Sequence, residues 1–213
     1  KIAAKNKINE LDKKFSLNEK YLKQTIFDDV VNSDEIKSLF NLINKKIGRY
    51  NTDYNCHYLL NHTPKNKNKN SKRNFHFDAY KLTMIVPINT GDKKNYENAM
   101  NLDIVPNIRK ETNSMIVNLF YKGLFQNNIF RKLSNTNIFS YFIKHKALQV
   151  KHDQIIIFNG FRSLHSASIS KSTIQSEKTR LIIHAYNPFA NNKINKLIFN
   201  NIQKDRDKKI KGW

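Results

Sequence analysis

A histidine and an aspartate stand one residue apart at the head of an apolar run, in the stretch NFHFDAYKLTMIVPIN (residues 74–89). Side chains alternate between the two faces of a strand, so His76 and Asp78 are predicted to point to the same side of a sheet. Burying an imidazole beside a carboxylate adds little stability by itself, whereas a metal ion could bind both side chains. The pair is therefore a candidate for two ligands of a metal site on a strand.

Strand-like segments with bulky, aromatic or continuously apolar residues recur along the chain. They are residues 26–31, 54–62, 114–125 (a strand or other buried segment), 137–144, 146–150, 153–160 and 178–189. The run 153–160 contains the continuous apolar stretch IIIF, which is typical of a strand buried on both faces, so we expect it near the centre of a sheet. The polar stretch 65–73 is predicted to be a solvated loop, and residues 90–113 are polar and rich in turn signals.

Two further segments repeat apolar residues at helical spacing. Asn32 and Glu35 form a capping-box pattern before the first, and Gly48 can end it. Its apolar residues are Ile36, Leu39, Phe40, Ile43 and Ile47; the second segment repeats Ile194, Leu197, Ile198 and Ile202, which are expected to pack on the core. One helical front followed by many strands favours a mostly antiparallel sandwich or barrel. The predicted fold class is mostly β with flanking helices.

The formal net charge of +21 is a strong compositional feature. Such a charge fits a polyanionic partner, but Lys, Asn and Ile are abundant together, as in chains from AT-rich genomes, so nucleic-acid binding is kept only as an alternative. Cys56 is the single cysteine, and no stretch has a signal-peptide core or membrane-spanning length. We therefore expect a soluble, cytoplasmic protein with no membrane span.

A metal site needs a third ligand, and His165 is the candidate. It follows the 153–160 run and its terminal Gly160, whereas the rival His152 precedes that run. Two histidines and one carboxylate on one side of a metal leave positions open, as in non-haem iron(II) oxygenases. The H-x-D pair alone is weak, because about 0.4 matches are expected by chance in a chain of this composition.

Arg180 follows His165 by 15 residues and heads the strand-like stretch RLIIHAY. On a strand it shares one face with His184 and Tyr186. An arginine on a buried strand face needs an anion, and a bidentate guanidinium–carboxylate pair would meet that need.

At these residues the sequence resembles a known family. The stretches HFDAYKLTMIVPIN, DQIIIFNGFRSLH and KTRLIIHAY are similar to the core of the iron(II)- and 2-oxoglutarate-dependent dioxygenases, over residues 25–189. The resemblance implies a double-stranded β-helix, or jelly-roll, core. Residues 1–24 are then expected to form a basic arm or helix, and 190–213 a basic helical tail. The chain departs from many members at Asp153, where they have a glycine.

The resemblance also implies roles for individual residues. His76, Asp78 and His165 would bind Fe(II), and Arg180 would bind the C5 carboxylate of 2-oxoglutarate, with a hydrogen bond from Tyr58 on the preceding strand. Dioxygen would be the second co-substrate, and succinate and CO2 the products. The carboxylate of Asp78 argues against a halogenase, which leaves that position to halide.

No motif specifies the substrate. Arg162 and His184 are weak candidates for substrate contacts, against a solvated loop arginine and a core histidine. A small or carrier-linked organic molecule is favoured, because the chain has no extended aromatic and basic platform for a polymer. The alternatives to a hydroxylating dioxygenase are a basic nucleic-acid or polyanion-binding module and a catalytically silent metal-binding β-helix protein. The loops expected to carry specificity are 62–74, 90–113, 121–136 and 166–179.

Overall fold

The structure is a computed structural model, and it describes residues 15–47, 54–64, 74–89, 100–112, 114–136, 139, 141, 143–169 and 177–209. The first 14 residues of the expected basic arm, the helix stop at Gly48 and the solvated loop 65–73 lie outside the described residues. Within the described residues, no helix combines the length and the apolar character needed to cross a membrane.

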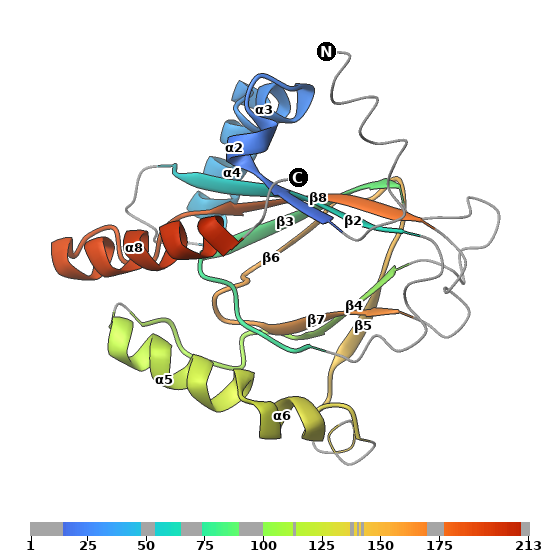
Figure 1. Cartoon of the computed structure of the whole chain (residues 1–213), viewed down its shortest axis with the longest axis vertical. Helices are drawn as coiled ribbons and strands as arrows, with labels where there is room; N and C mark the ends of the chain where they lie inside the picture. Colours follow the sequence, from blue (N-terminus) through green and yellow to red (C-terminus); the bar gives the residue numbers. More distant parts are fainter. Residues whose placement is uncertain are drawn as a thin grey trace.

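Two antiparallel sheets face each other at the centre of the molecule (Figure 1). The larger sheet has the strand order β1-β2-β8-β3-β6 and the smaller sheet the order β5-β4-β7. The strands are β1 (Phe15–Asn18), β2 (Cys56–Thr63), β3 (Leu82–Asn89), β4 (Met100–Val105), β5 (Lys146–Val150), β6 (Ile156–Phe158), β7 (Leu164–Ile169) and β8 (Lys178–Ala185). An isolated bridge between His76 and His165 adds a short extended segment beside β7.

The strand pairing is that of a jelly roll. From β2 onward, and with the His76 segment as the second strand, the chain runs through eight extended segments. The first pairs with the last (β2 with β8), the second with the seventh (the His76 segment with β7), the third with the sixth (β3 with β6) and the fourth with the fifth (β4 with β5). Such nested pairing arises when one long hairpin is rolled into two facing sheets. The predicted fold class, mostly β with flanking helices around a double-stranded β-helix, is confirmed.

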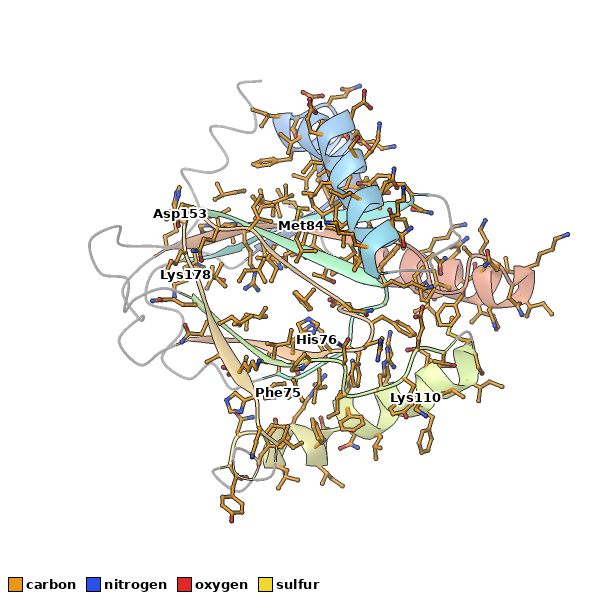
Figure 2. The ribbon with its side chains drawn as sticks, turned by 180° about the vertical axis from the view of Figure 1, so that it is seen from behind. Phe75, His76, Met84, Lys110, Asp153 and Lys178 are labelled. Carbon is orange, nitrogen blue, oxygen red and sulfur yellow. The ribbon has the colours of Figure 1, made fainter. Side chains whose placement is uncertain are left out.

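Apolar side chains fill both faces of the larger sheet. Between the sheets, Ile85, Leu102 and Val150 are buried and pack with partly buried neighbours. The outer face packs against helices through Met84 of β3 and Ile183 of β8 (Figure 2). Because side chains alternate along a strand, β8 buries alternate residues on the outer face and turns the others toward the space between the sheets.

Helices cover the outer sides of both sheets. They are α2 (Glu19–Leu22), α3 (Ile26–Val31), α4 (Asp34–Ile47), α5 (Met115–Gln126), α6 (Asn128–Leu133) and α8 (Lys193–Lys209). Helices α2 to α4 lie beyond the larger sheet, and α5 and α6 lie on the side of the smaller one (Figure 1). Phe40 on α4 is fully buried against the larger sheet. On the other side, Phe125 and Phe130 pack against a cluster that includes Phe77 and Leu164.

The segment Ile26–Val31 forms helix α3, so the predicted strand is wrong there. The hydroxyl of Thr25 accepts a hydrogen bond from the backbone N–H of Phe27 at 3.3 Å and caps the helix. The helix predicted next is confirmed as α4, but its cap is shifted by one residue. Asn32 ends α3, and the hydroxyl of Ser33 accepts from the backbone N–H three residues later at 3.3 Å.

Other local predictions also need correction. Residues 114–125 form helix α5 instead of a strand, and Ser114 caps it by accepting from a backbone N–H at 3.4 Å. Within 137–144 the described residues include Phe139 and Tyr141, which are helical. The run 153–160 contributes only the short strand β6, which is half-buried at a sheet edge and not central. The turn-rich stretch 90–113 contains strand β4.

Helix α8 forms at the predicted place, but the apolar residues that were expected to pack on the core are largely exposed. Ile194, Leu197 and Ile198 are 71%, 63% and 40% exposed. The residue that does anchor the helix is Phe199, which is 4% exposed and lies with its ring centroid 5.3 Å from that of Tyr80. At the other end of the chain, Phe15–Asn18 of the expected basic arm or helix pairs instead as an edge strand with β2.

Candidate metal centre

His76 and Asp78 precede β3 and do not open it, since β3 begins at Leu82 after a bend. The backbones of His76 and His165 exchange two hydrogen bonds, of 2.9 and 3.0 Å, and the N–H of Asp78 donates to the carbonyl of Gly160 at 2.9 Å. The segment from His76 to Asp78 is therefore extended, and its backbone is hydrogen-bonded along one side. This geometry keeps the side chains of His76 and Asp78 on a common side, as the alternation predicted.

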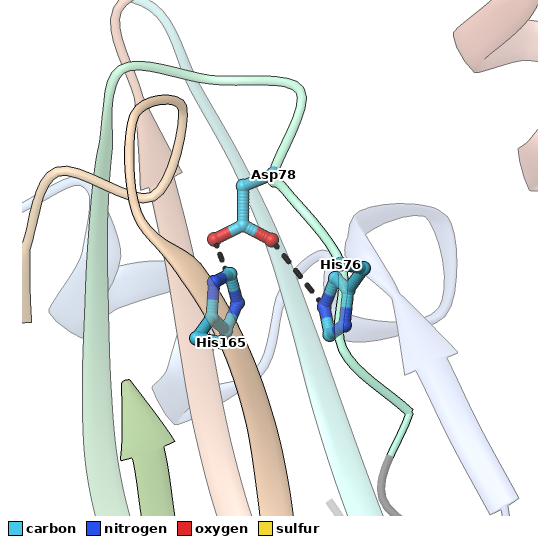
Figure 3. A group of neighbouring side chains, drawn as sticks. All are labelled: His76, Asp78 and His165. Carbon is cyan, nitrogen blue, oxygen red and sulfur yellow. Dashed lines mark ion pairs between the residues drawn. The ribbon is translucent and has the colours of Figure 1, made fainter. Parts of the chain in front are cut away.

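The side chains of His76, Asp78 and His165 meet beside the space between the two sheets (Figures 2 and 3). Oδ1 of Asp78 lies 3.7 Å from Nε2 of His76, and Oδ2 lies 3.3 Å from Nε2 of His165. One potential ligand atom from each residue lies within 4.8 Å of the other two. The three residues singled out in the sequence are thus brought together in the fold.

Backbone carbonyls set the tautomer of both imidazoles. Nδ1 of His76 lies 2.9 Å from the carbonyl oxygen of Asn74, and Nδ1 of His165 lies 3.0 Å from that of Ser163. A carbonyl oxygen can only accept, so in each neutral ring Nδ1 carries the proton and Nε2 has a free lone pair. Both free lone pairs belong to the nitrogens nearest Asp78. Two imidazole nitrogens and one carboxylate suit a divalent first-row metal, so the donor set fits such an ion.

The electrostatics of the cluster keep Asp78 and His76 in the forms that can bind a metal, an ionised carboxylate and a neutral imidazole. Burial by itself would raise the pKa of Asp78, but His165, His184 and His76 outweigh burial and hold that pKa well below its usual value. Desolvation by the surrounding protein lowers the pKa of His76 to about 4, and His165 adds to this effect. Burial also acts to lower the pKa of His165, but the Asp78 carboxylate outweighs it and raises the pKa. At neutral pH the cluster therefore has an ionised carboxylate and at least one neutral imidazole.

Two residues that hold Asp78 in place were not assigned a role from the sequence. The hydroxyl of Thr83 donates to Oδ2 of Asp78 at 2.5 Å and lies 3.1 Å from Nδ1 of His184. Gly160 lies against Asp78 so closely that a side chain there would overlap the carboxylate. The sequence does contain a signal for Thr83. It is a threonine inside the apolar run LTMIVPI, and a buried hydroxyl needs a hydrogen-bond partner.

Gly160→Ala should disturb the site. The added Cβ would lie 2.2 Å from Oδ2 of Asp78 and 2.3 Å from Oγ1 of Thr83, so the carboxylate must move. We expect Mn(II) affinity to fall by at least about tenfold, as for the loss of an outer-shell partner of a metal ligand. Gly123→Ala on α5 is the matched control, since its Cβ would meet nothing within 4 Å. Equal Mn(II) affinity in both variants would contradict this role for Gly160.

Arg180 lies on the inner face of β8. Its strand neighbour two residues on, Ile182, pairs with Ile85, which is buried between the two sheets. Burial lowers the pKa of Arg180 to about 10, so the guanidinium is cationic at neutral pH. The positive charge of Arg180 disfavours protonation of His165 and so acts to lower the pKa of that imidazole.

Tyr58 does not face the site. It pairs with Ile183 across β2 and β8, so it lies on the outer face, and its hydroxyl donates to Oδ1 of Asp28 in α3. The geometry therefore contradicts the predicted hydrogen bond from Tyr58 to 2-oxoglutarate. The physical reason is the alternation of side chains, since a shift of one residue along a strand changes the face. The residue of β2 opposite Arg180 is Asn61.

His184 lies beside Asp78, with Nδ1 3.9 Å from Oδ2 of the carboxylate. Its ring is stacked with those of Tyr80 and His57, at centroid distances of 6.0 and 6.4 Å. These three rings form one wall next to the cluster. Arg162 occupies the turn between β6 and β7, and its Nε donates to a backbone carbonyl of the loop after β4 at 3.0 Å, so it is not a freely solvated loop arginine.

No protein-family model matches the chain, and no curated protein matches it. Among solved structures, the chain is similar to the non-haem α-ketoglutarate-dependent epimerase SnoN from nogalamycin biosynthesis, at 14% identity and a TM-score of 0.49, over 91% of this chain and 75% of that one. It is also similar to a prolyl-4-hydroxylase from Pseudomonas putida, at 11% identity and a TM-score of 0.46, over 87% and 84%.

A third similar structure is an oxidoreductase of the 2OG-Fe(II) oxygenase family from Burkholderia pseudomallei, at 9% identity and a TM-score of 0.43. The match covers 75% of this chain and 54% of that one, so this chain spans about half the length of that protein. Likeness at these levels assigns neither an activity nor a substrate, which have to be argued from the residues of this chain.

Proposed function

We propose that this chain is an Fe(II)- and 2-oxoglutarate-dependent dioxygenase that hydroxylates a small or carrier-linked organic substrate. The observation that carries the proposal is the convergence of two Nε2 atoms and one carboxylate within a jelly roll. Arg180 on the inner face of β8 adds a cation suited to the far end of a dicarboxylate.

The donor set favours iron(II) chemistry over a closed structural site. Structural zinc sites are usually completed by four protein ligands, whereas three such residues converge in the described part of the chain. Two imidazoles and one carboxylate bound to one side of a metal leave adjacent positions for exogenous ligands, which an oxygenase with a chelating co-substrate requires. The ligand residues would be His76, Asp78 and His165.

When bound, Fe(II) and 2-oxoglutarate would supply the oxidising chemistry, consuming dioxygen and yielding succinate and CO2. The chain's own residues would bind the metal and the co-substrate and hold them in the required orientation. Thr83 fixes the orientation of the Asp78 carboxylate through its hydroxyl. Arg180 presents a planar fork, cationic at neutral pH, that can pair bidentately with the C5 carboxylate. Buried apolar residues between the sheets, such as Ile85 and Leu102, exclude water from the interior.

The spacing along β8 is compatible with this assignment. Arg180 lies four residues before His184 on the same strand face, which corresponds to about 13 Å between their backbones. His184 in turn lies beside Asp78. From this spacing we infer that a five-carbon dicarboxylate would lie between the guanidinium and the ligand cluster.

The substrate would approach the cluster along the wall that contains His184. The side chain of His184 is 14% exposed and its ring stacks with two other rings, so a flat or apolar group could pack beside them. Arg162 remains a second candidate for a substrate contact. Neither residue narrows the substrate beyond a small or carrier-linked organic molecule.

The test is turnover of 2-oxoglutarate by the purified protein with Fe(II) and ascorbate, followed as succinate formed, together with calorimetric binding of 2-oxoglutarate to the Mn(II) protein. We expect saturable binding and metal-dependent succinate that His76→Ala abolishes. Metal binding without 2-oxoglutarate binding would instead indicate a silent metal-binding protein. Absence of metal binding, with nucleic-acid affinity that falls steeply with salt, would indicate the basic binding module.

A further inference from the structure

Arg109 is a buried arginine in the loop that follows β4, and it is 2% exposed. Its guanidinium lies between two aromatic rings, with Cζ 4.1 Å from the ring centroids of both Phe77 and Phe161. Nε donates to the carbonyl oxygen of Phe161 at 2.5 Å, and Nη1 donates to Oδ1 of Asn118 on α5 at 3.0 Å. One side chain thus joins three separate segments of the chain.

Burying this guanidinium is costly. Among the described residues, Nη2 has no hydrogen-bond partner, and no carboxylate lies within ion-pair distance of the guanidinium. Burial lowers the pKa of Arg109 only to about 10, so the side chain is still charged at neutral pH. An apolar residue of similar length would fill the same space without this desolvation. A buried arginine is therefore a costly choice for stability alone, although its hydrogen bonds and ring contacts offset part of that cost.

The two rings belong to the segments that carry the metal ligands. Phe77 stands between His76 and Asp78, and its ring points away from them into the cluster on the side of α5 and α6. Phe161 follows Gly160, whose carbonyl accepts a hydrogen bond from the N–H of Asp78. The turn that contains Phe161 leads directly into β7, where His165 is the second residue. The guanidinium is therefore clamped between the segment with two ligands and the segment with the third.

Further contacts fix this clamp to its surroundings. The backbone N–H of Arg109 donates to the carbonyl of Arg162 at 3.4 Å, and Nε of Arg162 donates back to the carbonyl of Arg109 at 3.0 Å. Nε2 of Gln126 on α5 donates to the carbonyl of Phe77 at 3.4 Å. The loop, the turn before β7 and helix α5 therefore hold one another in a single arrangement.

We propose that Arg109 is a positioning residue of the metal centre, an inference that rests on the metal site of the proposed function. By holding Phe77 and Phe161 against its two faces, Arg109 fixes the separation of the His76–Asp78 segment from His165. The planar guanidinium suits this task, because it can stack on a ring with each face while its edge donates hydrogen bonds. Neither methionine nor lysine can do both.

The test compares Co(II) binding to metal-free wild type, Arg109→Met and Arg109→Lys, followed by the visible absorption of the bound ion. We expect Arg109→Met to weaken Co(II) affinity by about 10- to 100-fold, as for other outer-shell partners, and to change the shape of the spectrum. Arg109→Lys keeps the charge but loses the fork, so its affinity should be intermediate. The spectrum reports the ligand geometry, which a loss of stability alone does not alter.

Phe40→Leu is the matched control, because Phe40 on α4 is fully buried in a different cluster, against the larger sheet. It should lower the melting temperature while leaving Co(II) affinity and spectrum unchanged. Phe77→Leu should weaken Co(II) binding like Arg109→Met, and the double variant should lose less than the two single effects combined, because both remove the same contact.

Two results overturn different claims. If wild type binds no Co(II), the proposed metal site fails, and this inference fails with it. If wild type binds Co(II) and folded Arg109→Met binds it equally tightly with the same spectrum, only the positioning role fails. If Arg109→Met does not fold, Arg109→Lys and Phe77→Leu provide the test instead. If both of these variants bind Co(II) with the affinity and the spectrum of wild type, the positioning role of Arg109 is overturned.

Discussion

Replacing Asp78 by alanine is expected to abolish metal binding while the jelly roll stays folded. Asp78 supplies the carboxylate of the cluster, and its oxygens lie 3.7 and 3.3 Å from Nε2 of His76 and His165. Two neutral imidazoles alone hold a divalent ion far more weakly. Because losing an outer-shell partner already costs about 10- to 100-fold in affinity, we expect a loss of at least about 100-fold in this variant. Calorimetric titration of the metal-free protein with Mn(II) measures the effect, and circular dichroism checks the fold.

His152→Ala is the control for this prediction. His152 is the other histidine considered as third ligand, and it is exposed in the turn before β6. It should bind Mn(II) as wild type does, whereas His165→Ala should behave like Asp78→Ala. Wild-type Mn(II) affinity in Asp78→Ala, or a comparable loss in His152→Ala, would show that the metal binds elsewhere.

Arg180→Leu is expected to retain Mn(II) but to bind 2-oxoglutarate much more weakly. Arg180 is not among the ligand residues, yet its guanidinium is the proposed partner of the C5 carboxylate on the inner face of β8. Loss of a charge-assisted bidentate pair costs about 2–5 kcal/mol, or roughly thirty- to several-thousand-fold in affinity. Arg180→Lys should recover part of the affinity, since an ammonium lacks the planar fork. Calorimetry with the Mn(II) proteins measures all three.

A change of net charge is a separate effect that this comparison must exclude. Lys196→Leu removes one positive charge from an exposed position on α8 and should bind 2-oxoglutarate as wild type does. Undiminished affinity in Arg180→Leu means that the anchor lies elsewhere. Equal losses in Arg180→Leu and Lys196→Leu would mean that the general positive potential, and not a specific pair, attracts the co-substrate.

The three residues of the candidate metal site could be singled out from the sequence because residue type and local spacing carry their chemistry. An imidazole and a carboxylate two positions apart on an extended segment share a side, and that holds even though His76 and Asp78 lie before β3. The jelly roll places His165 opposite them through the pairing of β7 with the same segment. No spacing rule connects Arg109 with Phe77 and Phe161, because only the tertiary fold brings these three together.

The errors arose where several physical solutions share one local pattern. The segments Ile26–Val31 and 114–125 each suit a strand or a short helix, and the caps Thr25 and Ser114 decide for helix. Tyr58 shows the same sensitivity within a strand that was placed correctly. Its register with Ile183 turns it toward α3, and periodicity alone does not say which face of a strand is the inner one.

The most direct test of the account is the crystal structure of the protein soaked with Mn(II) and 2-oxoglutarate, with anomalous diffraction to locate the metal. We expect one anomalous peak at bonding distance from Nε2 of His76, Nε2 of His165 and a carboxylate oxygen of Asp78. The density of 2-oxoglutarate should run from that peak to the guanidinium of Arg180. A metal bound to other residues, or 2-oxoglutarate bound away from both the metal and Arg180, would contradict the account.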